Sequence, residues 1–349
     1  MTSLIGNAPV DGVDVAALLG IPISAEQERA VQAPLKPCAV IAGAGPGKTT
    51  VMAARVVWLV ASRLVSPEEI LGLTFTNKPT AELSERIESN LTRVGLLTSE
   101  QPRPTVATYD SFAGTLVNDY GAWDGISTGA HLITGARAYQ LAAEVVMGLD
   151  KAPLAATHMG PTFIAQAVVK LAGAMASHDA SPGKVRRADA RWRQMLLAAP
   201  TKRGGDRYAD IDKWLSRVDE REELLDLVAA YQNLKKERGL VEFGDRMVQA
   251  LHLVTHHPRV GEELRARYRV VLLDEYQDTS SAQADVLAAL FSGPDSAHGM
   301  GHPVMAVGDP LQAIYEWRGA AASNILEFHR RFPNKEGTPA QVLSLATNR

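Results

Sequence analysis

The stretch Ala42-Gly43-Ala44-Gly45-Pro46-Gly47-Lys48-Thr49-Thr50 decides the fold of this chain. An apolar run at 38–41 leads into it, and the helix-forming run 51–55 follows. A strand, a glycine-rich turn and a helix in this order are typical of a phosphate-binding loop, whose backbone N–H groups converge on a phosphate. In such a loop Lys48 would reach the β- and γ-phosphates of a nucleotide, and the Thr49 hydroxyl would hold Mg²⁺.

Two positions of the loop depart from the strict phosphate-loop pattern. Ala42 stands where that pattern has glycine, and Pro46 removes one N–H donor. A glycine-rich turn that binds nothing is the alternative interpretation. We expect a bound nucleotide to contact the whole loop, that is Ala42, Gly43, Ala44, Gly45, Pro46, Gly47, Lys48, Thr49 and Thr50.

Short apolar runs alternate with helical patterns at both ends of the chain. Continuous apolar strands with helical crossovers are typical of a parallel sheet that is covered on both faces, and ligands of such sheets lie at the carboxyl ends of the strands. The sequence therefore predicts an α/β fold with a parallel sheet. The expected strands are 40–42, 70–76, 105–108, 270–274 and 304–308.

The middle of the chain has a different pattern. Apolar residues recur there at helical spacing, as between Trp214 and Leu234, and no run is clearly a strand. We expect an all-helical domain at 114–239, inserted into a discontinuous α/β domain formed by 1–113 and 240–349. The polar segment 201–206 is expected to be a mobile loop of this insert.

The composition indicates an ordinary globular protein, with 46% apolar and 21% charged residues and a net charge of −3. The net charge gives no sign of nucleic-acid binding, but eight basic residues gather between positions 184 and 207 against two acidic ones. Such a strip either contacts phosphates or forms a solvated helix face. The basic residues are Lys184, Arg186, Arg187, Arg191, Arg193, Lys202, Arg203 and Arg207.

Cysteine usage and hydropathy point to the cytoplasm. Cys38 is the only cysteine, so an internal disulfide is impossible, which fits a reducing compartment. No apolar run approaches the length of a membrane span, and the N-terminus does not resemble a signal peptide. We therefore expect a cytoplasmic protein without a membrane partner.

Two further strand ends carry polar residues that suit a nucleotide site. Asp274 follows an apolar run and could hold the water shell of Mg²⁺, and Glu275 could orient or deprotonate an attacking water. Gln312 follows the next apolar run and could sense the γ-phosphate. A charged exit from a strand is the alternative interpretation of the acidic pair.

An aromatic and basic group follows Gln312. Tyr315, Trp317 and Arg318 could stack on unpaired bases and contact phosphates. From spacing alone, packing of the two aromatic residues in the core is the favoured alternative.

Six segments in order resemble the motifs of the UvrD/Rep group of superfamily 1 DNA helicases. They are 24–31, 73–78, 108–112, 242–245, 274–278 and 312–320. Within that group, segments 52–61 and 111–116 look most like the AdnB-type subunit of actinobacterial helicase–nuclease complexes. The resemblance implies a P-loop (RecA-like) motor domain that uses ATP and Mg²⁺ to move along single-stranded DNA, in the 3′ to 5′ direction.

The resemblance also assigns roles to residues. Gln27 would read adenine, Lys48, Glu275 and Gln312 would be catalytic, and Phe75 and Trp317 would stack on bases. The implied DNA contacts are Thr74, Phe75, Asn77, Thr108, Tyr315, Trp317 and Arg318. The implied partners are single-stranded DNA and DNA ends in repair and recombination, and a second helicase–nuclease subunit.

Some positions depart from the family pattern. Asp110 stands in place of the usual histidine, which puts a negative charge near the expected DNA path, and Pro79-Thr80 replaces an alanine pair. The chain ends at Arg349, where the next motif of the family begins. The alternative is therefore a truncated, non-catalytic product that binds ATP and DNA without a second motor domain. A P-loop kinase or GTPase is disfavoured, because neither explains 312–320.

Overall fold

The computed structural model describes residues 10–43, 45, 47–127, 129–150, 160–202, 205–315 and 319–346. The chain folds into two compact units. The first unit comprises Met1–Asp124 and Gln249–Arg349, and the second comprises Gly125–Val248. The sequence placed the insert at 114–239; in the structure, α5 (Tyr109–Tyr120) continues past that limit within the first unit.

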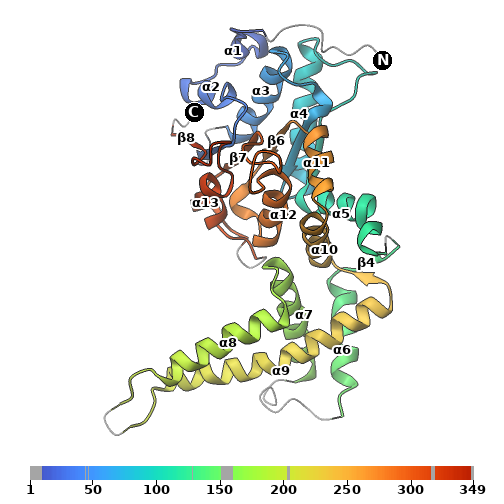
Figure 1. The fold of residues 1–349 in the computed structure, drawn as a ribbon, viewed down its shortest axis with the longest axis vertical. Helices are drawn as coiled ribbons and strands as arrows, with labels where there is room; N and C mark the ends of the chain where they lie inside the picture. The colour runs from blue at the N-terminus through green and yellow to red at the C-terminus, as the bar shows by residue number, and fades with distance from the viewer. Residues whose placement is uncertain are drawn as a thin grey trace. The chain divides into compact units, whose positions relative to one another are not determined.

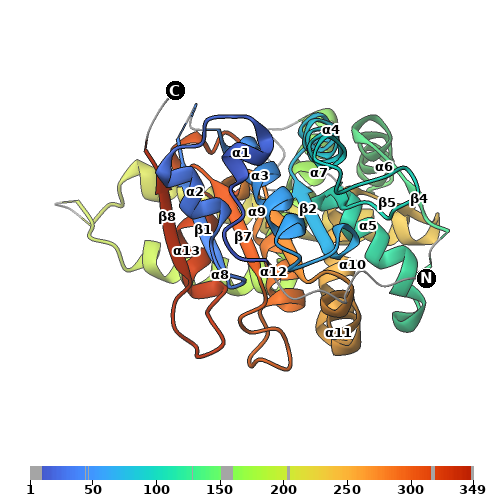
Figure 2. The same cartoon turned by 90° about the horizontal axis from the view of Figure 1, so that it is seen from above.

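The first unit contains a six-stranded parallel sheet, which confirms the α/β prediction (Figures 1 and 2). Its strand order is β3-β2-β6-β7-β1-β8. The strands are β1 (Cys38–Ala42), β2 (Ile70–Thr74), β3 (Thr105–Thr108), β6 (Val270–Leu273), β7 (Val304–Gly308) and β8 (Gln341–Leu345). The strand β8 was not predicted. It pairs with β1 at the edge of the sheet and is mostly exposed, so its sequence lacks the continuous apolar run of the inner strands.

Helices cover both faces of this sheet. On one face the helices α1 (Val15–Leu19), α2 (Ala25–Val31), α3 (Lys48–Ala61) and α4 (Asn77–Arg93) share a hydrophobic core with alternate residues of the strands, such as Val40 and Val307. The helix α13 (Ser323–Arg331) contacts β1 and β7, and α12 (Ser281–Phe291) contacts α13 and α11 (Pro258–Arg267). Burial on both faces explains why the inner strands β1, β2, β6 and β7 are mainly apolar.

The described part of the first unit also contains four short 3₁₀ helices. They are η1 (Pro67–Glu69), η2 (Gly121–Asp124), η3 (Tyr276–Asp278) and η4 (Pro310–Gln312). The last two closely follow β6 and β7, so the chain turns sharply at these strand ends. The helix α10 (Phe243–His256) runs across the sequence boundary between the two units.

The second unit is mainly helical. It contains α6 (Gly135–Met147), α7 (Pro161–Ser177), α8 (Pro182–Leu197) and α9 (Ala209–Glu237), and α6, α7 and α9 contribute a common hydrophobic core (Figure 1). It is not all-helical as predicted, because β4 (His131–Leu132) pairs in parallel with β5 (Leu240–Val241). Strands of two residues are too short to show a period in the sequence. Part of the expected loop 201–206, residues 203–204, lies outside the described residues.

Four of the eight basic residues of the strip in and after α8 pair with acidic residues of the second unit. Lys184 pairs with Asp179, and Arg207 pairs with Asp212. Arg186 pairs with two carboxylates of α9, those of Glu222 and Asp226, and Arg193 pairs with Asp219. These four cations thus hold α8 and the following segment to acidic neighbours, which favours the solvated-face interpretation for them.

Among the described residues, the structure has no helix that combines the length and the apolar character needed to cross a membrane.

Candidate nucleotide site

The glycine-rich turn joins β1 to α3 as the sequence predicted. Gly45 and Gly47 have φ angles of 94° and 81°, in the left-handed region that favours glycine. Gly47 is the N-cap of α3 and provides no side chain to cap the helix. The first N–H groups of α3 therefore remain available to an anion, and the positive end of the helix dipole favours one there. Ala44 and Pro46 lie outside the described residues.

Lys48 is the first residue of α3 and meets residues from two other strand ends. Its Nζ lies 2.9 Å from Glu275 Oε2, beyond β6, and 3.5 Å from Gln312 Oε1, beyond β7. The structure thus brings together the three residues that were expected to be catalytic, although Lys48 lies more than 220 positions before the other two. Thr49 and Thr50 lie in the same first turn of α3, and Thr50 Oγ1 accepts a hydrogen bond from Arg86 of α4.

The acidic pair at the end of β6 sits in a constrained turn. Asp274 is buried, with 4% of its surface exposed, and its Oδ1 accepts a hydrogen bond from the Glu275 N–H. Burial raises the pKa of Asp274 to about 7; the charge of Glu275 also raises it, whereas the Lys48 ammonium lowers it. Glu275 has a φ angle of 46°, which is uncommon for a residue with a side chain. This conformation lets the carboxylate of Glu275 reach Lys48.

Two residues that the sequence did not single out connect these strand ends. The buried Gln277 donates from Nε2 to Glu275 Oε2, at 2.7 Å, and its Oε1 accepts a hydrogen bond from the Asp309 N–H, at 3.0 Å. Asp309 in turn accepts a 2.6 Å hydrogen bond from Gln312 Nε2. Gly308 permits this approach, because a Cβ there would overlap Gln277 Oε1. The only feature of the sequence that could have indicated this role was an amide side chain, Gln277, two positions after the acidic pair.

Gln27 reaches the loop from α2. Its side chain forms a capping box with Ser24, in which Gln27 Oε1 accepts from the Ser24 N–H at 2.9 Å. Its Nε2 lies 3.1 Å from the position that a Cβ on Gly47 would occupy. The amide therefore lies beside the loop while its oxygen serves the helix start.

The oxygen atoms at this edge suit Mg²⁺. A magnesium ion in such a site takes one or two protein ligands together with phosphate oxygens and waters. Asp274 offers a buried carboxylate whose raised pKa reflects a poorly compensated charge, and Thr49 offers a hydroxyl in the first turn of α3. Among the described residues, no group of three or more histidine, cysteine, aspartate or glutamate side chains could hold a metal on its own.

The residues expected to contact DNA do not all lie together. Phe75 and Tyr315 lie together, with ring centroids 4.7 Å apart and planes tilted by 37°. Asn77 is exposed at the start of α4. Trp317 and Arg318 lie outside the described residues.

Thr74 and Thr108 have local roles in the first unit. Thr74 is buried, and its Oγ1 contacts Thr80 Oγ1 and donates to the Thr76 carbonyl. Thr108 caps α5 by accepting a hydrogen bond from the Ser111 N–H. These contacts explain both residue types without a ligand.

Asp110, the departure from the family pattern, lies in the first turn of α5. It accepts a 2.9 Å hydrogen bond from Gln283 Nε2. The carboxylate of Asp110 is thus hydrogen-bonded to Gln283, an amide side chain of α12.

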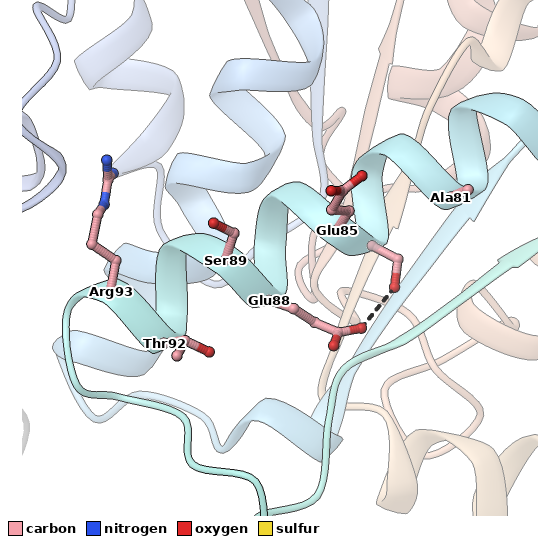
Figure 3. Close-up of a pocket in the computed structure, with 7 residues that line it drawn as sticks. Ala81, Glu85, Glu88, Ser89, Thr92 and Arg93 are labelled. Carbon is pink, nitrogen blue, oxygen red and sulfur yellow. Dashed lines mark hydrogen bonds between the residues drawn. The ribbon is translucent and has the colours of Figure 1, made fainter.

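A shallow hollow on the outer side of α4 is distinct from these residues (Figure 3). It is formed along one helix, and within it Ser84 donates a hydrogen bond to Glu88. Its lining residues are Ala81, Ser84, Glu85, Glu88, Ser89, Thr92 and Arg93. None of them belongs to the loop or to the three strand ends, so the hollow plays no part in the nucleotide site.

Similarity to known helicases extends over most of the chain. Residues 23–333 match the family model of the UvrD/REP helicase N-terminal domain. The chain is 27% identical to DNA helicase II of Rickettsia typhi over 313 residues, which cover 89% of this chain and 40% of that protein. It is 28% identical to the ATP-dependent DNA helicase UvrD1 of Mycobacterium tuberculosis, over 89% of this chain and 36% of that protein.

A third relative is DNA helicase II of Escherichia coli, with 27% identity over 93% of this chain and 38% of that protein. The chain thus spans 36 to 40% of the length of these relatives. The matched family model covers the loop and all three strand ends described above.

Proposed function

Because this chain belongs to the UvrD/Rep helicase family, we propose that it is the ATP-binding motor domain of a DNA helicase or translocase. The observation that carries the proposal is the meeting of Lys48, Glu275 and Gln312 beyond the ends of β1, β6 and β7. Phosphoryl transfer needs positioning and charge compensation more than covalent chemistry by the protein. A lysine, a carboxylate and an amide at one loop are the parts that this chemistry uses.

In the proposed site, the N–H groups of the loop and the first turn of α3 bind the phosphates of ATP. Lys48 exchanges its contact with Glu275 for a γ-phosphate oxygen, which frees the Glu275 carboxylate to accept a proton from the attacking water. Gln277 keeps Glu275 oriented during this exchange, because it donates to the same Oε2 as Lys48 and can retain that hydrogen bond when Lys48 moves away. Mg²⁺, held by Thr49 and through water by Asp274, would offset the charge of the phosphates.

We propose that single-stranded DNA contacts the surface that carries Phe75 and Tyr315. The two rings form a tilted pair, and exposed aromatic faces bind unpaired bases independently of sequence. Tyr315 follows Gln312 by three residues, so a base contact and the γ-phosphate contact share one short segment. Asn77, Trp317 and Arg318 complete the proposed contact, with movement in the 3′ to 5′ direction.

The second unit is proposed to be a helical insertion into this motor domain. We propose that the protein acts in the cytoplasm on DNA ends, in repair and recombination, as an AdnB-type subunit of a helicase–nuclease complex whose second subunit is its partner. The resemblance of segments 52–61 and 111–116 supports that assignment. Because the chain spans only 36 to 40% of its relatives, we propose that unwinding also uses segments of the kind that make up the rest of those proteins.

The test is ATP hydrolysis by the purified chain, with and without single-stranded oligo(dT). The proposal predicts Mg²⁺-dependent ATP binding, and turnover that increases when the DNA is added. The matched control is Glu275→Gln, which should retain ATP binding and lose turnover. Absence of ATP binding would overturn the proposal, whereas intact binding without DNA-stimulated turnover would favour the non-catalytic alternative, in which this chain is not an autonomous motor.

A further inference from the structure

Arg55 is a buried cation on the helix that begins at the phosphate loop. It lies two turns after Lys48 in α3, and 1% of its surface is exposed. Burial lowers the pKa of Arg55 to about 10, so its guanidinium remains charged at neutral pH. A buried charge is costly unless hydrogen bonds compensate it. The hydrogen-bond partners of Arg55 therefore indicate its role.

The guanidinium of Arg55 donates to backbone carbonyls at the end of α2. Its Nη1 lies 3.3 Å from the Ala30 oxygen, 3.0 Å from the Val31 oxygen and 2.8 Å from the Ala33 oxygen. Its Nη2 lies 3.3 Å from the Pro34 oxygen. The last carbonyls of a helix lack partners within the helix and carry its negative dipole end, so the guanidinium both caps α2 and attaches it to α3.

The other end of α2 lies beside the phosphate loop. Gln27 is in the first turn of α2, and its Nε2 approaches Gly47 while its Oε1 closes the capping box. The helix has only seven residues, so one rigid element connects the two ends. A shift of the carbonyls that Arg55 holds would therefore move the Gln27 amide relative to Lys48.

We propose that Arg55 is a positioning residue for base selection, which sets the place of Gln27 by fixing α2 to the helix of the phosphate loop. The inference rests on the proposed function, in which Gln27 reads the base of ATP. An amide can donate to and accept from adenine, whereas guanine presents a different pattern of donors and acceptors. Arg55 thus acts on the choice of base and not on the grip on the phosphates, which depends on Lys48 and the loop.

A purely structural role for Arg55 predicts something different. Loss of the cap would then lower the stability of the chain and weaken all phosphate-containing ligands together. Selectivity between ATP and GTP is the readout that separates the two roles, because only a displaced Gln27 changes it. Inorganic tripolyphosphate reports the phosphate grip without any base.

The experiment measures dissociation constants of ATP, GTP and tripolyphosphate, all with Mg²⁺, for the intact chain and its variants. Arg55→Lys retains the charge but loses the fork that reaches several carbonyls. Gln27→Glu retains the oxygen that accepts from Ser24 and replaces the donor of the amide. The matched control is Arg93→Lys, because Arg93 of α4 donates to the carbonyl of Leu19 at the end of α1.

We expect Arg55→Lys to weaken ATP binding about tenfold, the effect of losing one well-placed polar contact, and to change GTP and tripolyphosphate by less than about twofold. Combined with Gln27→Glu, Arg55→Lys should add less than about twofold, because the two residues act through one contact. Arg93→Lys should leave the dissociation constants of ATP, GTP and tripolyphosphate unchanged.

Two results with Arg55→Lys would overturn the inference. Equal weakening of all three ligands by Arg55→Lys, or a full additional effect in the Gln27→Glu background, would show that Arg55 acts on the fold alone. If the unmodified chain binds tripolyphosphate but does not prefer ATP to GTP, base reading by Gln27 fails and the inference falls with it. If it binds none of the three ligands, the proposed function itself is wrong.

Discussion

Lys48 and Lys235 each lie against acidic side chains, one in each unit, but their surroundings differ. Lys48 contacts one carboxylate, that of Glu275, and its side chain is 11% exposed while that of Glu275 is 32% exposed. Lys235 is 2% exposed and contacts two carboxylates, at 2.7 Å from Glu242 and 2.6 Å from Asp245. The first cluster is partly open, whereas the lysine of the second is enclosed.

The second cluster is also saturated with internal contacts. The Tyr231 hydroxyl donates to Glu242 Oε2 at 2.8 Å, and the Glu242 N–H donates to Asp245 Oδ2 at 2.8 Å. Burial and the Glu242 carboxylate raise the pKa of Tyr231 well above its usual range, so the hydroxyl stays protonated. The cluster joins the end of α9 to the start of α10 and leaves its lysine no room for a ligand.

The comparison shows that a lysine between carboxylates does not by itself mark a binding site. What distinguishes Lys48 is its place beyond the ends of parallel strands, in the first turn of a helix whose N-cap offers no side chain. The short acidic motif 242–245, which resembles a family motif, supplies structural partners in the second unit instead.

The enclosed cluster should give the largest change in stability. Lys235→Ala removes a buried cation and leaves the carboxylates of Glu242 and Asp245, 26% and 17% exposed, without it. Breaking a buried pair costs about 3–5 kcal/mol, and the partial exposure of these carboxylates places the expected loss near the lower limit. Urea unfolding followed by circular dichroism measures this. The matched control is Lys184→Ala, whose exposed pair with Asp179 should contribute only about 0–1 kcal/mol. Equal effects of both changes would contradict the distinction.

In the open cluster of Lys48 and Glu275, loss of the lysine should affect ligand binding more than stability. Lys48→Ala removes a cation from the loop and should weaken Mg²⁺–ATP binding about 10- to 100-fold, the range of one or more charge-assisted hydrogen bonds. Calorimetric titration measures this. We expect little loss of stability, because Lys48 and Glu275 are both partly exposed. Unchanged ATP binding by the variant would remove the loop from the site.

Asp274, next to Glu275 of the open cluster, should make the stability of the folded chain depend on pH when no nucleotide is bound. Its folded pKa of about 7 lies above the unfolded value of about 3.9, so the unfolded chain loses its proton first as pH rises. This group therefore destabilises the folded chain progressively between about pH 4 and 7, by at most about 1.4 kcal/mol per pH unit, and by a constant amount above that. Melting temperatures from pH 5 to 8 should show Asp274→Asn gaining stability relative to the unmodified chain; parallel curves would refute the assignment.

The smallest effect is expected in the basic strip. Arg186 pairs with Glu222 and Asp226 at the surface, where solvent screens the attraction. Arg186→Ala should leave both the unfolding midpoint and the affinity for Mg²⁺–ATP within experimental scatter. A large change in the unfolding midpoint would mean that exposed pairs stabilise the second unit as strongly as the enclosed Lys235 cluster does.

Much of the fold could be predicted because each buried strand is a continuous apolar run. This held for β1, β2, β6 and β7, which lie inside the sheet, whereas β3 was predicted although it is a partly buried edge strand. It failed for β8, which is half-exposed at an edge, and for β4 and β5, which have two residues each. Local patterns carry no signal for strands that are stabilised mainly by their neighbours.

The candidate site was predictable only where a motif carries its own chemistry. Lys48, Glu275 and Gln312 each follow an expected strand, and the structure brings them together. Gln277 and Asp309 acquire their roles only from the close approach of β6 and β7, which Gly308 permits. Arg55 resembled an ordinary helix residue, since the carbonyls that it binds lie more than 20 positions away.

Hydrogen–deuterium exchange with and without Mg²⁺–ATP tests the contrast between the two clusters most directly. The account predicts slower exchange in the first turn of α3, at 48–51, and in η3 (Tyr276–Asp278), with no change at 235–245 around Lys235. Slower exchange at 235–245, or no change at 48–51 under saturating nucleotide, would contradict it.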